Sequence, residues 1–455
     1  MRQMQEFKTL EDKIQVLGNP VHFLRNAQVG AYPFPFPAEF TNWRDEQTAW
    51  SETAVLFDQS FHMFDIYFKG PDVKRLFSDL GVNGFNGFGR GKAKQFVTCN
   101  YDGRVIADGI LFGMEDDEYN LVGTPVASNW VQFHAETGDY DVVVTRDEAS
   151  VVNTGERLQF RFQLNGPLTQ KIVERAHGKP LEPIGFFRMG EFDIAGVSVR
   201  ALNHTMAGVP GAEMTGLEIT GPVAKGPAVK DALLLAGEEF GLRLGGSEAY
   251  TSVTVESGWL PMPIPAIYSG EAMKPYREWL SGTGFEANMA MGGSFDSDDI
   301  EDYYTTPWDL GYARTIKFDH DFVGRAALEA MADEPHRRKV WLRWNDQDVA
   351  KTIADSLFGA PPRSKYMHLP CPVFSVTSYD KVVSGDRVVG ISNWMAYTTN
   401  VESMSSIAMI DEADAVDGRE VTVVWGEPDG GTVKPLVERH SQTDIRATIS
   451  TTPLV

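Results

Sequence analysis

The feature that most constrains the fold of this chain is a strand followed by a helix and further strands, which occurs twice in the first half. The first occurrence begins at residues 62–68, where alternation places every second side chain on one face of an expected strand. Pro71 opens the next helix, and residues 94–122 have the pattern of an antiparallel meander. The strand face contains His62, Phe64, Ile66 and Phe68, and the helix face contains Val73, Leu76, Phe77 and Leu80.

The second occurrence has the same order of elements. Residues 160–164 resemble a strand, Asn165-Gly166-Pro167 starts a helix that ends near His177, and residues 192–202 add a further strand. An amphipathic helix follows, and its apolar face contains Val229, Leu233, Ala236 and Phe240. Two such units with hairpins between them predict an α+β fold with antiparallel sheets.

The last part of the chain has a different pattern. From about Arg338 onward, short β segments alternate with turns, at residues 340–344, 373–378, 388–391, 407–410 and 420–425. Closely spaced strands of this kind predict a β-barrel or sandwich that closes the chain.

Composition excludes several classes of function. The net charge of −22 argues against nucleic acid as a partner, because nucleic-acid binding needs clustered Lys and Arg. The first residues lack the apolar region of a signal peptide, and no run of about eighteen apolar residues suggests a membrane span. Cys99 and Cys371 stand far apart without a CxxC partner. We therefore expect two reduced thiols, a cytoplasmic location and no membrane partner.

Sequence signatures of metal, phosphate or covalent chemistry are missing. The glycine-rich stretch 84–94 has Asn86 and Ala93 where a phosphate loop needs glycine and a hydroxyl side chain. No HExxH, Cys/His zinc spacing or GxSxG motif occurs, so we expect no metal site. Acid–base or transfer chemistry in a pocket is what remains.

Two stretches are candidates for lining such a pocket. Residues 248–261 are dense in Thr, Val and Tyr, which predicts a strand that ends at Ser-Gly-Trp, with Tyr250 on its polar face. This tyrosine either lines a cavity or is hydrogen-bonded at a sheet edge. The proline-rich loop 30–37 is either a structural wrap or a lid that carries Tyr32, Phe34 and Phe36.

Six short motifs point to a family, and they follow one another over residues 50–330. They are Leu56–Ser60, Tyr67–Asp72, Asn100–Gly109, Leu164–Pro167, Met214–Ile219 and Asp321–Leu328. In this order they resemble the folate-dependent aminomethyltransferase superfamily, typified by the glycine-cleavage T-protein.

Further stretches narrow the resemblance to one branch. They are Glu248–Trp259, Pro265–Gly270, Gly293–Phe295, Ile300–Tyr304, Leu24–Tyr32, Asn42–Arg44 and Val423–Glu427. These resemble the tetrahydrofolate-dependent aryl O-demethylases that act on vanillate and syringate. The resemblance implies three domains around a central folate channel, and methyl transfer from an aryl methyl ether to N5 of tetrahydrofolate.

The resemblance also implies domain boundaries. A discontinuous first α+β domain would comprise residues 1–60 and 155–266, and a second would comprise residues 61–154. Residues 267–337 would be a connecting segment, and residues 338–455 would form the C-terminal β-barrel.

Site residues are carried over from the family by matching positions. Tyr250 matches the catalytic tyrosine, and His62 matches a pocket histidine that would orient Tyr250 or the substrate. Glu218 matches the carboxylate that binds the N–H edge of the pterin, and Asn165 is a further cofactor position. Asp108 keeps one of two hairpin aspartates, with Ala107 in place of the other, and it could be only a turn residue.

The remaining implied site residues concern the aryl substrate. Gln59 and Trp259 match pocket positions, and Trp259 would also contact the cofactor. Thr124 stands where the vanillate-type enzymes carry an arginine, with Phe34 and Phe61 at positions that are more polar there. The resemblance thus implies a different aryl pocket for a small-molecule methoxyaromatic substrate.

Two other functions stay open at this point. The methyl donor could be a sulfonium or methylamine compound, in which case no acid on the leaving group is needed. The chain could also be a folate-binding module without catalytic activity.

Overall fold

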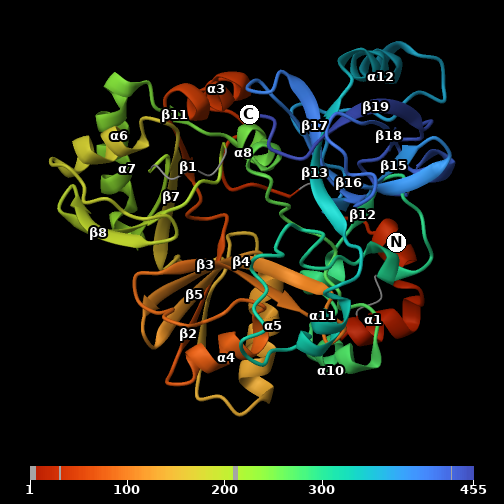
Figure 1. Cartoon of the computed structure of the whole chain (residues 1–455). Helices are drawn as coiled ribbons and strands as arrows, with labels where there is room; N and C mark the ends of the chain where they lie inside the picture. The colour runs from red at the N-terminus through yellow and green to blue at the C-terminus, as the bar shows by residue number, and fades with distance from the viewer. Residues whose placement is uncertain (1–6, 30–31, 209–213, 432) are drawn as a thin grey trace.

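The strands of this computed structural model fall into three larger groups, each in its own lobe (Figure 1). The structure describes residues 7–29, 32–208, 214–431 and 433–455. The expectation that the first residues are not a signal peptide concerns residues 1–6, which lie outside this description. Gly30 and Ala31 of the proline-rich loop also lie outside it.

The first lobe is a six-stranded sheet with the order β11-β1-β7-β10-β9-β8. Its neighbouring strands are antiparallel except for β1 and β11, which are parallel. The helices α6 and α7 pack on it and share its apolar core (Figure 1). The bounds are β1 Val55–Asp58, β7 Gln159–Asn165, α6 Thr169–His177, β8 Met189–Ile194, β9 Val197–Asn203, β10 Gly216–Pro222, α7 Gly226–Gly237 and β11 Arg243–Leu244.

The second lobe is a five-stranded antiparallel sheet with the order β3-β4-β5-β2-β6. The predicted meander and the helix after Pro71 are both confirmed. The bounds are β2 Phe64–Lys69, α4 Val73–Leu80, β3 Ala93–Cys99, β4 Val105–Glu115, β5 Glu118–Gly123, α5 Pro125–Thr137 and β6 Val143–Asp147.

The third lobe is a closed barrel of six strands, which confirms the predicted C-terminal barrel. Around the barrel the order is β13-β17-β16-β15-β18-β19. The bounds are β13 Arg337–Trp344, α12 Asp346–Phe358, β15 Asp380–Ser384, β16 Arg387–Thr398, β17 Ser403–Asp411, β18 Glu420–Trp425 and β19 Thr443–Ser450. The combination of two mixed lobes and a barrel confirms the α+β class.

Helices from the start of the chain and from its middle join the lobes. Leu10, Val21 and Leu24 are buried in the apolar core that also contains strand β2. The bounds are α1 Leu10–Leu17, α2 Pro20–Arg25, α3 Trp43–Glu52, α10 Lys274–Trp279 and α11 Arg325–Met331, and the short strands β12 Met291–Gly292 and β14 Thr377–Ser378 pair in parallel. The domain boundaries themselves stay a prediction.

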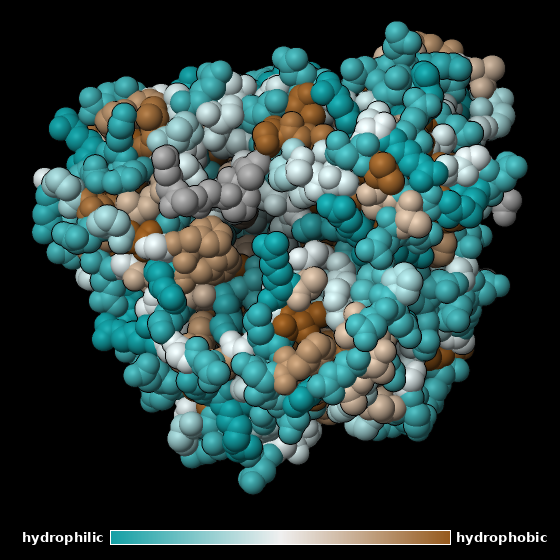
Figure 2. Space-filling view, in the orientation of Figure 1, coloured by the Kyte–Doolittle hydropathy of each residue, from teal (hydrophilic) through white to brown (hydrophobic). Residues whose placement is uncertain are grey.

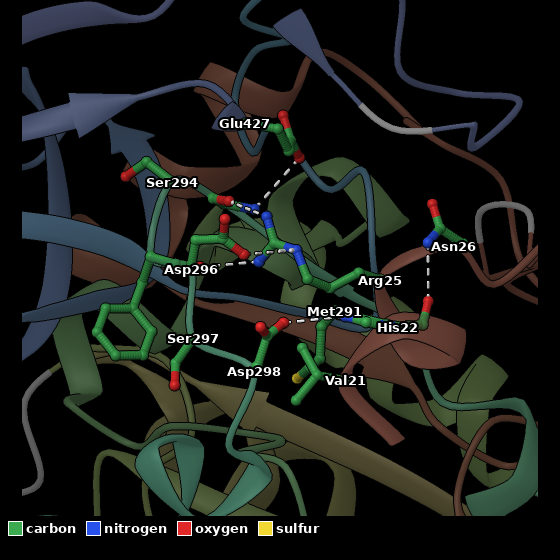
Figure 3. A network of polar contacts seen from close by, with 12 residues as sticks. Val21, His22, Arg25, Asn26, Met291, Ser294, Asp296, Ser297, Asp298 and Glu427 are labelled. Carbon is green, nitrogen blue, oxygen red and sulfur yellow. Dashed lines mark hydrogen bonds and ion pairs between the residues drawn. The ribbon is translucent and has the colours of Figure 1, made fainter. Parts of the chain in front are cut away.

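A buried polar network fastens α2 to the segment around β12 (Figure 3). Arg25 donates hydrogen bonds of 2.8 Å to the carbonyl oxygens of Gly293 and Phe295. Glu427, next to the barrel strand β18, accepts from the Gly293 amide at 3.2 Å. The N-terminal helices, the connecting segment and the barrel therefore share one set of hydrogen bonds.

The predicted strand at residues 248–261 is wrong. The structure has two short helices there, α8 Ser247–Ser252 and α9 Thr254–Ser257. The buried residues include Ala249, Ser252, Val253 and Glu256, which have helical spacing. Two of these four are polar, and the residues between Val253 and Glu256 are buried as well, so the sequence shows no clear helical period. Gly258 ends α9 with φ +73°, so the Ser-Gly-Trp sequence ends a helix and not a strand.

A smaller correction concerns His62. Strand β2 begins at Phe64, and His62 lies in the turn before it. Phe64, Ile66 and Phe68 are all buried, and Ile66 and Phe68 belong to the apolar core of the second lobe.

The surface agrees with the acidic composition. The face seen in Figure 2 is mostly hydrophilic, with hydrophobic side chains in separate patches. In the part of the chain that the structure describes, no helix has both the length and the apolar character needed to cross a bilayer.

Candidate active site

Tyr250 lies on α8, and its ring packs against Phe34, Phe36 and Phe57. The helix begins after Gly246, where a Cβ would lie 2.1 Å from the carbonyl oxygen of Ala38, so only glycine permits this close approach. The Tyr250 hydroxyl accepts a hydrogen bond of 3.3 Å from Gln59 Nε2 and contacts the Met63 sulfur at 3.8 Å. A thioether is a weak acceptor, so the Tyr250 hydroxyl can redirect its hydrogen bond to a better acceptor at little cost.

Aromatic rings surround the ring of Tyr250. The centroids of His62, Phe57, Phe36 and Phe34 lie 5.1, 5.4, 5.8 and 5.9 Å from its own. Phe34 and Phe36 come from the proline-rich loop, which therefore forms one wall of this cluster. Burial raises the pKa of Tyr250, so its hydroxyl stays protonated at neutral pH.

His62 joins the same cluster through Tyr32. The distance from His62 Nδ1 to the Tyr32 hydroxyl is 3.1 Å, and the two ring centroids lie 5.2 Å apart. Burial, and to a smaller extent the positive charge of Arg157, lowers the pKa of His62 to about 4. The imidazole is therefore neutral at pH 7 and can orient neighbouring groups by hydrogen bonding.

Glu218 lies at one end of a buried chain of ion pairs between the first two lobes. Arg161 on β7 pairs with both Glu218 on β10 and Asp65 on β2, and Arg157 pairs with Asp65 and Asp147. All five side chains are at most 6% exposed. Three carboxylates against two guanidiniums leave one negative charge uncompensated in this buried chain.

Hydrogen bonds connect these ion pairs to Tyr250. The backbone N–H of Gln59 donates to the Arg161 carbonyl oxygen at 2.9 Å, and the side-chain Nε2 of Gln59 contacts the Met206 sulfur at 3.1 Å. Met206 stands two residues after His204 in the sequence, and His204 Nε2 lies against Glu218 Oε2. A series of hydrogen bonds and contacts therefore links the tyrosine to the glutamate at the junction of the first two lobes.

Asp108 forms a second polar centre with Trp259. Its Oδ2 accepts hydrogen bonds from Trp259 Nε1 at 3.0 Å, from Gln95 Nε2 at 2.6 Å and from the Tyr312 hydroxyl. Asp108 lies within β4 and is only 8% exposed, so the reading as a turn residue is wrong. Burial raises its pKa, and these hydrogen bonds and the nearby Lys339 oppose that shift.

Comparisons with known proteins fit this geometry. The model of the GCVT N-terminal domain family matches residues 18–262. The chain belongs to this family.

Individual relatives extend the match to almost the whole chain. Syringate O-demethylase of Sphingobium sp. (strain NBRC 103272 / SYK-6) is 45% identical over 448 residues, covering 98% of this chain and 96% of that protein. Sesamin methylene transferase of Sinomonas sp. (strain No.22) is 29% identical over 435 residues, covering 92% of this chain and 90% of that protein.

A solved structure confirms the fold. Aminomethyltransferase T of the glycine cleavage system from Bartonella henselae superposes with a TM-score of 0.62 at 17% identity. The superposition covers 95% of this chain and 96% of that one. The aminomethyltransferase fold that the sequence motifs predicted is therefore the fold of this GCVT-family chain.

Most of the predicted site residues lie near one another in this GCVT-family chain. Tyr250, His62, Gln59 and Phe34 form one cluster. Glu218 is linked to this cluster only through Arg161, whose side chain pairs with Glu218 and whose carbonyl oxygen accepts from the backbone N–H of Gln59. Thr124 caps α5 and follows Gly123, which pairs with Phe64 two residues beyond His62. Their individual roles stay predictions.

Two predicted residues stand apart. Phe61 is 44% exposed, and among the described side chains its ring has no aromatic partner. Asn165 is fully buried and hydrogen-bonds to backbone atoms of Thr215 and Ala207 at 3.5 and 3.3 Å. These bonds tie β7 to Ala207 and to Thr215, and the role of Asn165 toward the cofactor stays a prediction.

Sequence reasoning missed Arg161, His204 and Tyr312. In β7 polar and apolar residues alternate, so the sequence does not distinguish Arg161 on a buried polar face from an arginine on an exposed one. His204 and Tyr312 carry no local signal either, because their contacts are made with residues of other elements.

A separate open crevice lies away from this site. It has a volume of about 520 Å³ and lies at the far ends of β2 and β10, where its walls include Tyr67, Lys69, Thr220 and Pro222. None of the predicted site residues lines it.

Proposed function

We propose that this chain is a tetrahydrofolate-dependent O-demethylase. It transfers the methyl group of a methoxylated aromatic compound to N5 of tetrahydrofolate and gives a phenol and 5-methyltetrahydrofolate. Substrates of the syringate, vanillate or 3-O-methylgallate type fit this proposal, which is supported by the 45% identity to a syringate O-demethylase.

The observation that carries the proposal is the environment of the Tyr250 hydroxyl. An aryl methyl ether releases a phenolate whose conjugate acid titrates near ~10, which makes it a poor leaving group. Tyr250 stays protonated, and its hydrogen currently has only a thioether to donate to among the described residues. Donation to the ether oxygen would stabilise the charge that develops as the C–O bond breaks.

Neighbouring residues would hold Tyr250 in position. Gln59 directs one of its N–H groups to the tyrosine oxygen, which leaves the hydroxyl hydrogen free to turn toward the substrate. His62 packs its ring against that of Tyr250 at an interplanar angle of 89°. The rings of Phe34 and Phe36 supply apolar surface for an aromatic ring.

The polar groups around Glu218 fit the pterin of tetrahydrofolate. When bound, the cofactor supplies the secondary amine N5 that accepts the methyl group. The pterin edge is rich in N–H donors, and the site is rich in acceptors: the Glu218 carboxylate, and the Oε1 atoms of Gln59 and Gln163, which are buried without a described partner. Trp259, whose indole N–H donates to Asp108, would supply an aromatic face to the cofactor.

The wider setting follows from the same proposal. The three domains would surround a central folate channel, with the boundaries given by the family resemblance. We place the enzyme in the cytoplasm, a setting in keeping with Cys99 and Cys371, which are free, buried thiols.

A product assay tests this function. The protein would be incubated with tetrahydrofolate and, separately, with vanillate, syringate, 3-O-methylgallate and guaiacol, and the phenol and methyl-folate products would be followed. We expect equal amounts of phenol and 5-methyltetrahydrofolate from at least one compound. Binding of tetrahydrofolate without turnover of any methoxyarene would contradict the proposal.

A further inference from the structure

Arg161 lies beside the glutamate that is expected to bind the pterin. Glu218 on β10 stands opposite Gln163 on β7, and Arg161 is two residues from Gln163 in the same strand. Arg161 and Glu218 are therefore diagonal neighbours on one face of the sheet, close enough for long side chains to meet. The Arg161 side chain is 2% exposed, so its charge is withdrawn from water and depends on its partners.

The guanidinium of Arg161 is shared between the first two lobes. Its Nη1 donates to Glu218 Oε1, and its Nη2 donates to Asp65 Oδ1 on β2. Its Cζ lies over the ring of Phe112 on β4, 5.1 Å from the ring centroid. Asp65 in turn accepts from Asn120 Nδ2 at 2.9 Å. The second lobe therefore fixes the direction from which Arg161 meets Glu218.

The Glu218 carboxylate is held at both oxygens. Arg161 Nη1 donates to Oε1, and His204 Nε2 lies against Oε2. A carboxylate oxygen can accept more than one hydrogen bond, so both oxygens keep capacity for a ligand. Because Arg161 is also paired with Asp65, its charge compensates that of Glu218 only in part. Glu218 is thus a fixed acceptor with residual negative charge, which suits the N–H edge of a pterin.

The backbone of Arg161 holds the other half of the site. Its N–H donates to Ser60 Oγ at 3.0 Å, and its carbonyl oxygen accepts from the backbone N–H of Gln59 at 2.9 Å. The side chain of Gln59 donates to the Tyr250 hydroxyl at 3.3 Å. Arg161 therefore holds the glutamate through its side chain, and the segment that supports the tyrosine through its main chain.

We propose that Arg161 is a positioning residue for tetrahydrofolate: its side chain fixes the Glu218 carboxylate so that the carboxylate accepts from the N–H edge of the pterin. This inference rests on the proposed function, which supplies the ligand and the role of Glu218. Since the bonds that support Tyr250 come from the main chain, the Arg161 side chain acts on the affinity for the cofactor and not on the chemical step.

Equilibrium binding of tetrahydrofolate tests the inference without any turnover. Arg161→Met removes both ion pairs of the side chain, and we expect its Kd for tetrahydrofolate to rise at least about tenfold. The matched control is Arg157→Met. Arg157 is also 2% exposed and pairs with Asp65, but its other partner is Asp147 and not Glu218. The Kd of this control should stay within about twofold of wild type, although both variants should lower the urea midpoint of unfolding.

A paired variant keeps the test decisive if Arg161→Met does not fold. Arg161→Met/Asp65→Asn removes one positive and one negative charge together, so the buried ion pairs keep their net charge. It still loses the connection between Glu218 and the second lobe, and we expect the same rise in Kd.

Steady-state kinetics separate positioning from a general loss of structure. In Arg161→Met, or in the paired variant, the KM for tetrahydrofolate should rise about tenfold, while kcat at saturating tetrahydrofolate and the KM for the methoxyarene stay within about threefold of wild type. A merely structural role would move all three.

The two proposals fail in different ways. An Arg161 variant that binds tetrahydrofolate within about twofold of wild type, or an equal rise of Kd in Arg157→Met, would overturn the inference. Failure of wild type to demethylate any methoxyarene, with the binding results as expected, would overturn only the proposed function. A wild type that does not bind tetrahydrofolate would overturn both.

Discussion

At the scale of single residues, the site is defined by the hydrogen-bond acceptors that are available to each donor. Tyr250 has a strong donor in Gln59 and a weak acceptor in Met63, so its hydroxyl hydrogen is available to a substrate. His62 and His204 are neutral because they are buried, and each can therefore accept as well as donate. The chemistry depends on these orientations more than on any single charge.

The role of Gln59 gives a prediction at this scale. Gln59→Leu keeps the volume but removes the donor that fixes the Tyr250 oxygen, so kcat should fall about tenfold with little change in the KM for tetrahydrofolate. Gln47→Leu is the matched control. Gln47 is also buried, but it hydrogen-bonds to Ser252 and Tyr397, outside the tyrosine cluster. Steady-state kinetics of both variants would check this, and equal losses of kcat would contradict it.

Thr124 gives a prediction about the substrate. Thr124→Arg would add a guanidinium at the start of α5, close to the turn that contains His62. Turnover of methoxybenzoates relative to guaiacol should rise several-fold, since a carboxylate would gain a bidentate partner. An unchanged ratio of the two rates would show that Thr124 does not face the substrate.

At the scale of elements, α8 and α9 show how a polar buried face changes the reading of a sequence. Glu256 is 1% exposed and accepts from Trp50 Nε1 at 2.7 Å and from Asn400 Nδ2 at 3.0 Å. It thereby ties α9 to α3 and to the loop after β16. Residues that are usually exposed occupy core positions here because their partners come from distant segments.

The buried glutamate supports a test of this element. Glu256→Ala would leave the Trp50 indole N–H and the Asn400 amide without their acceptor, and should lower the free energy of unfolding by about 2–4 kcal/mol. Ser257→Ala, on the same helix, should change it by less than about 0.5 kcal/mol. Urea unfolding would measure both. Similar values for the two variants would mean that Glu256 does not hold α9 in place.

The same elements show what could be predicted from the sequence. Apolar periodicity sufficed for α4, whose buried residues are apolar, and for β2, where Ile66 and Phe68 face the apolar core although Asp65 is buried as well. It failed at residues 248–257, where Ser252 and Glu256 are buried through hydrogen bonds that no local pattern reveals. Tyr250 and His62 were found through family motifs, whereas His204 and Tyr312 became visible only through their contacts in space.

At the scale of the whole molecule, three neutral and partly buried histidines link stability to pH. Burial lowers the pKa of His62, His134 and His204, each to about 4. The unfolded chain binds more protons on these groups between about 4 and 6.5, so stability is full above about pH 6.5 and falls as the pH drops toward 4.

His134 isolates this effect away from the site. It packs against Trp130 at 4.3 Å between ring centroids, and its Nε2 is buried without a described partner. Between pH 7.5 and 5, wild type should lose about 2 kcal/mol more of its unfolding free energy than His134→Phe. Urea titrations at the two pH values provide the numbers. Parallel losses in both proteins would show that His134 is not buried in its neutral form.

The central claim is that the Tyr250 hydroxyl assists departure of the aryl oxygen during methyl transfer to tetrahydrofolate. The most direct measurement is single-turnover formation of 5-methyltetrahydrofolate from syringate by wild type and Tyr250→Phe, with tetrahydrofolate binding measured in parallel. The phenylalanine keeps the ring contacts, so binding should persist while the rate falls at least about 100-fold. A rate near that of wild type would contradict the claim.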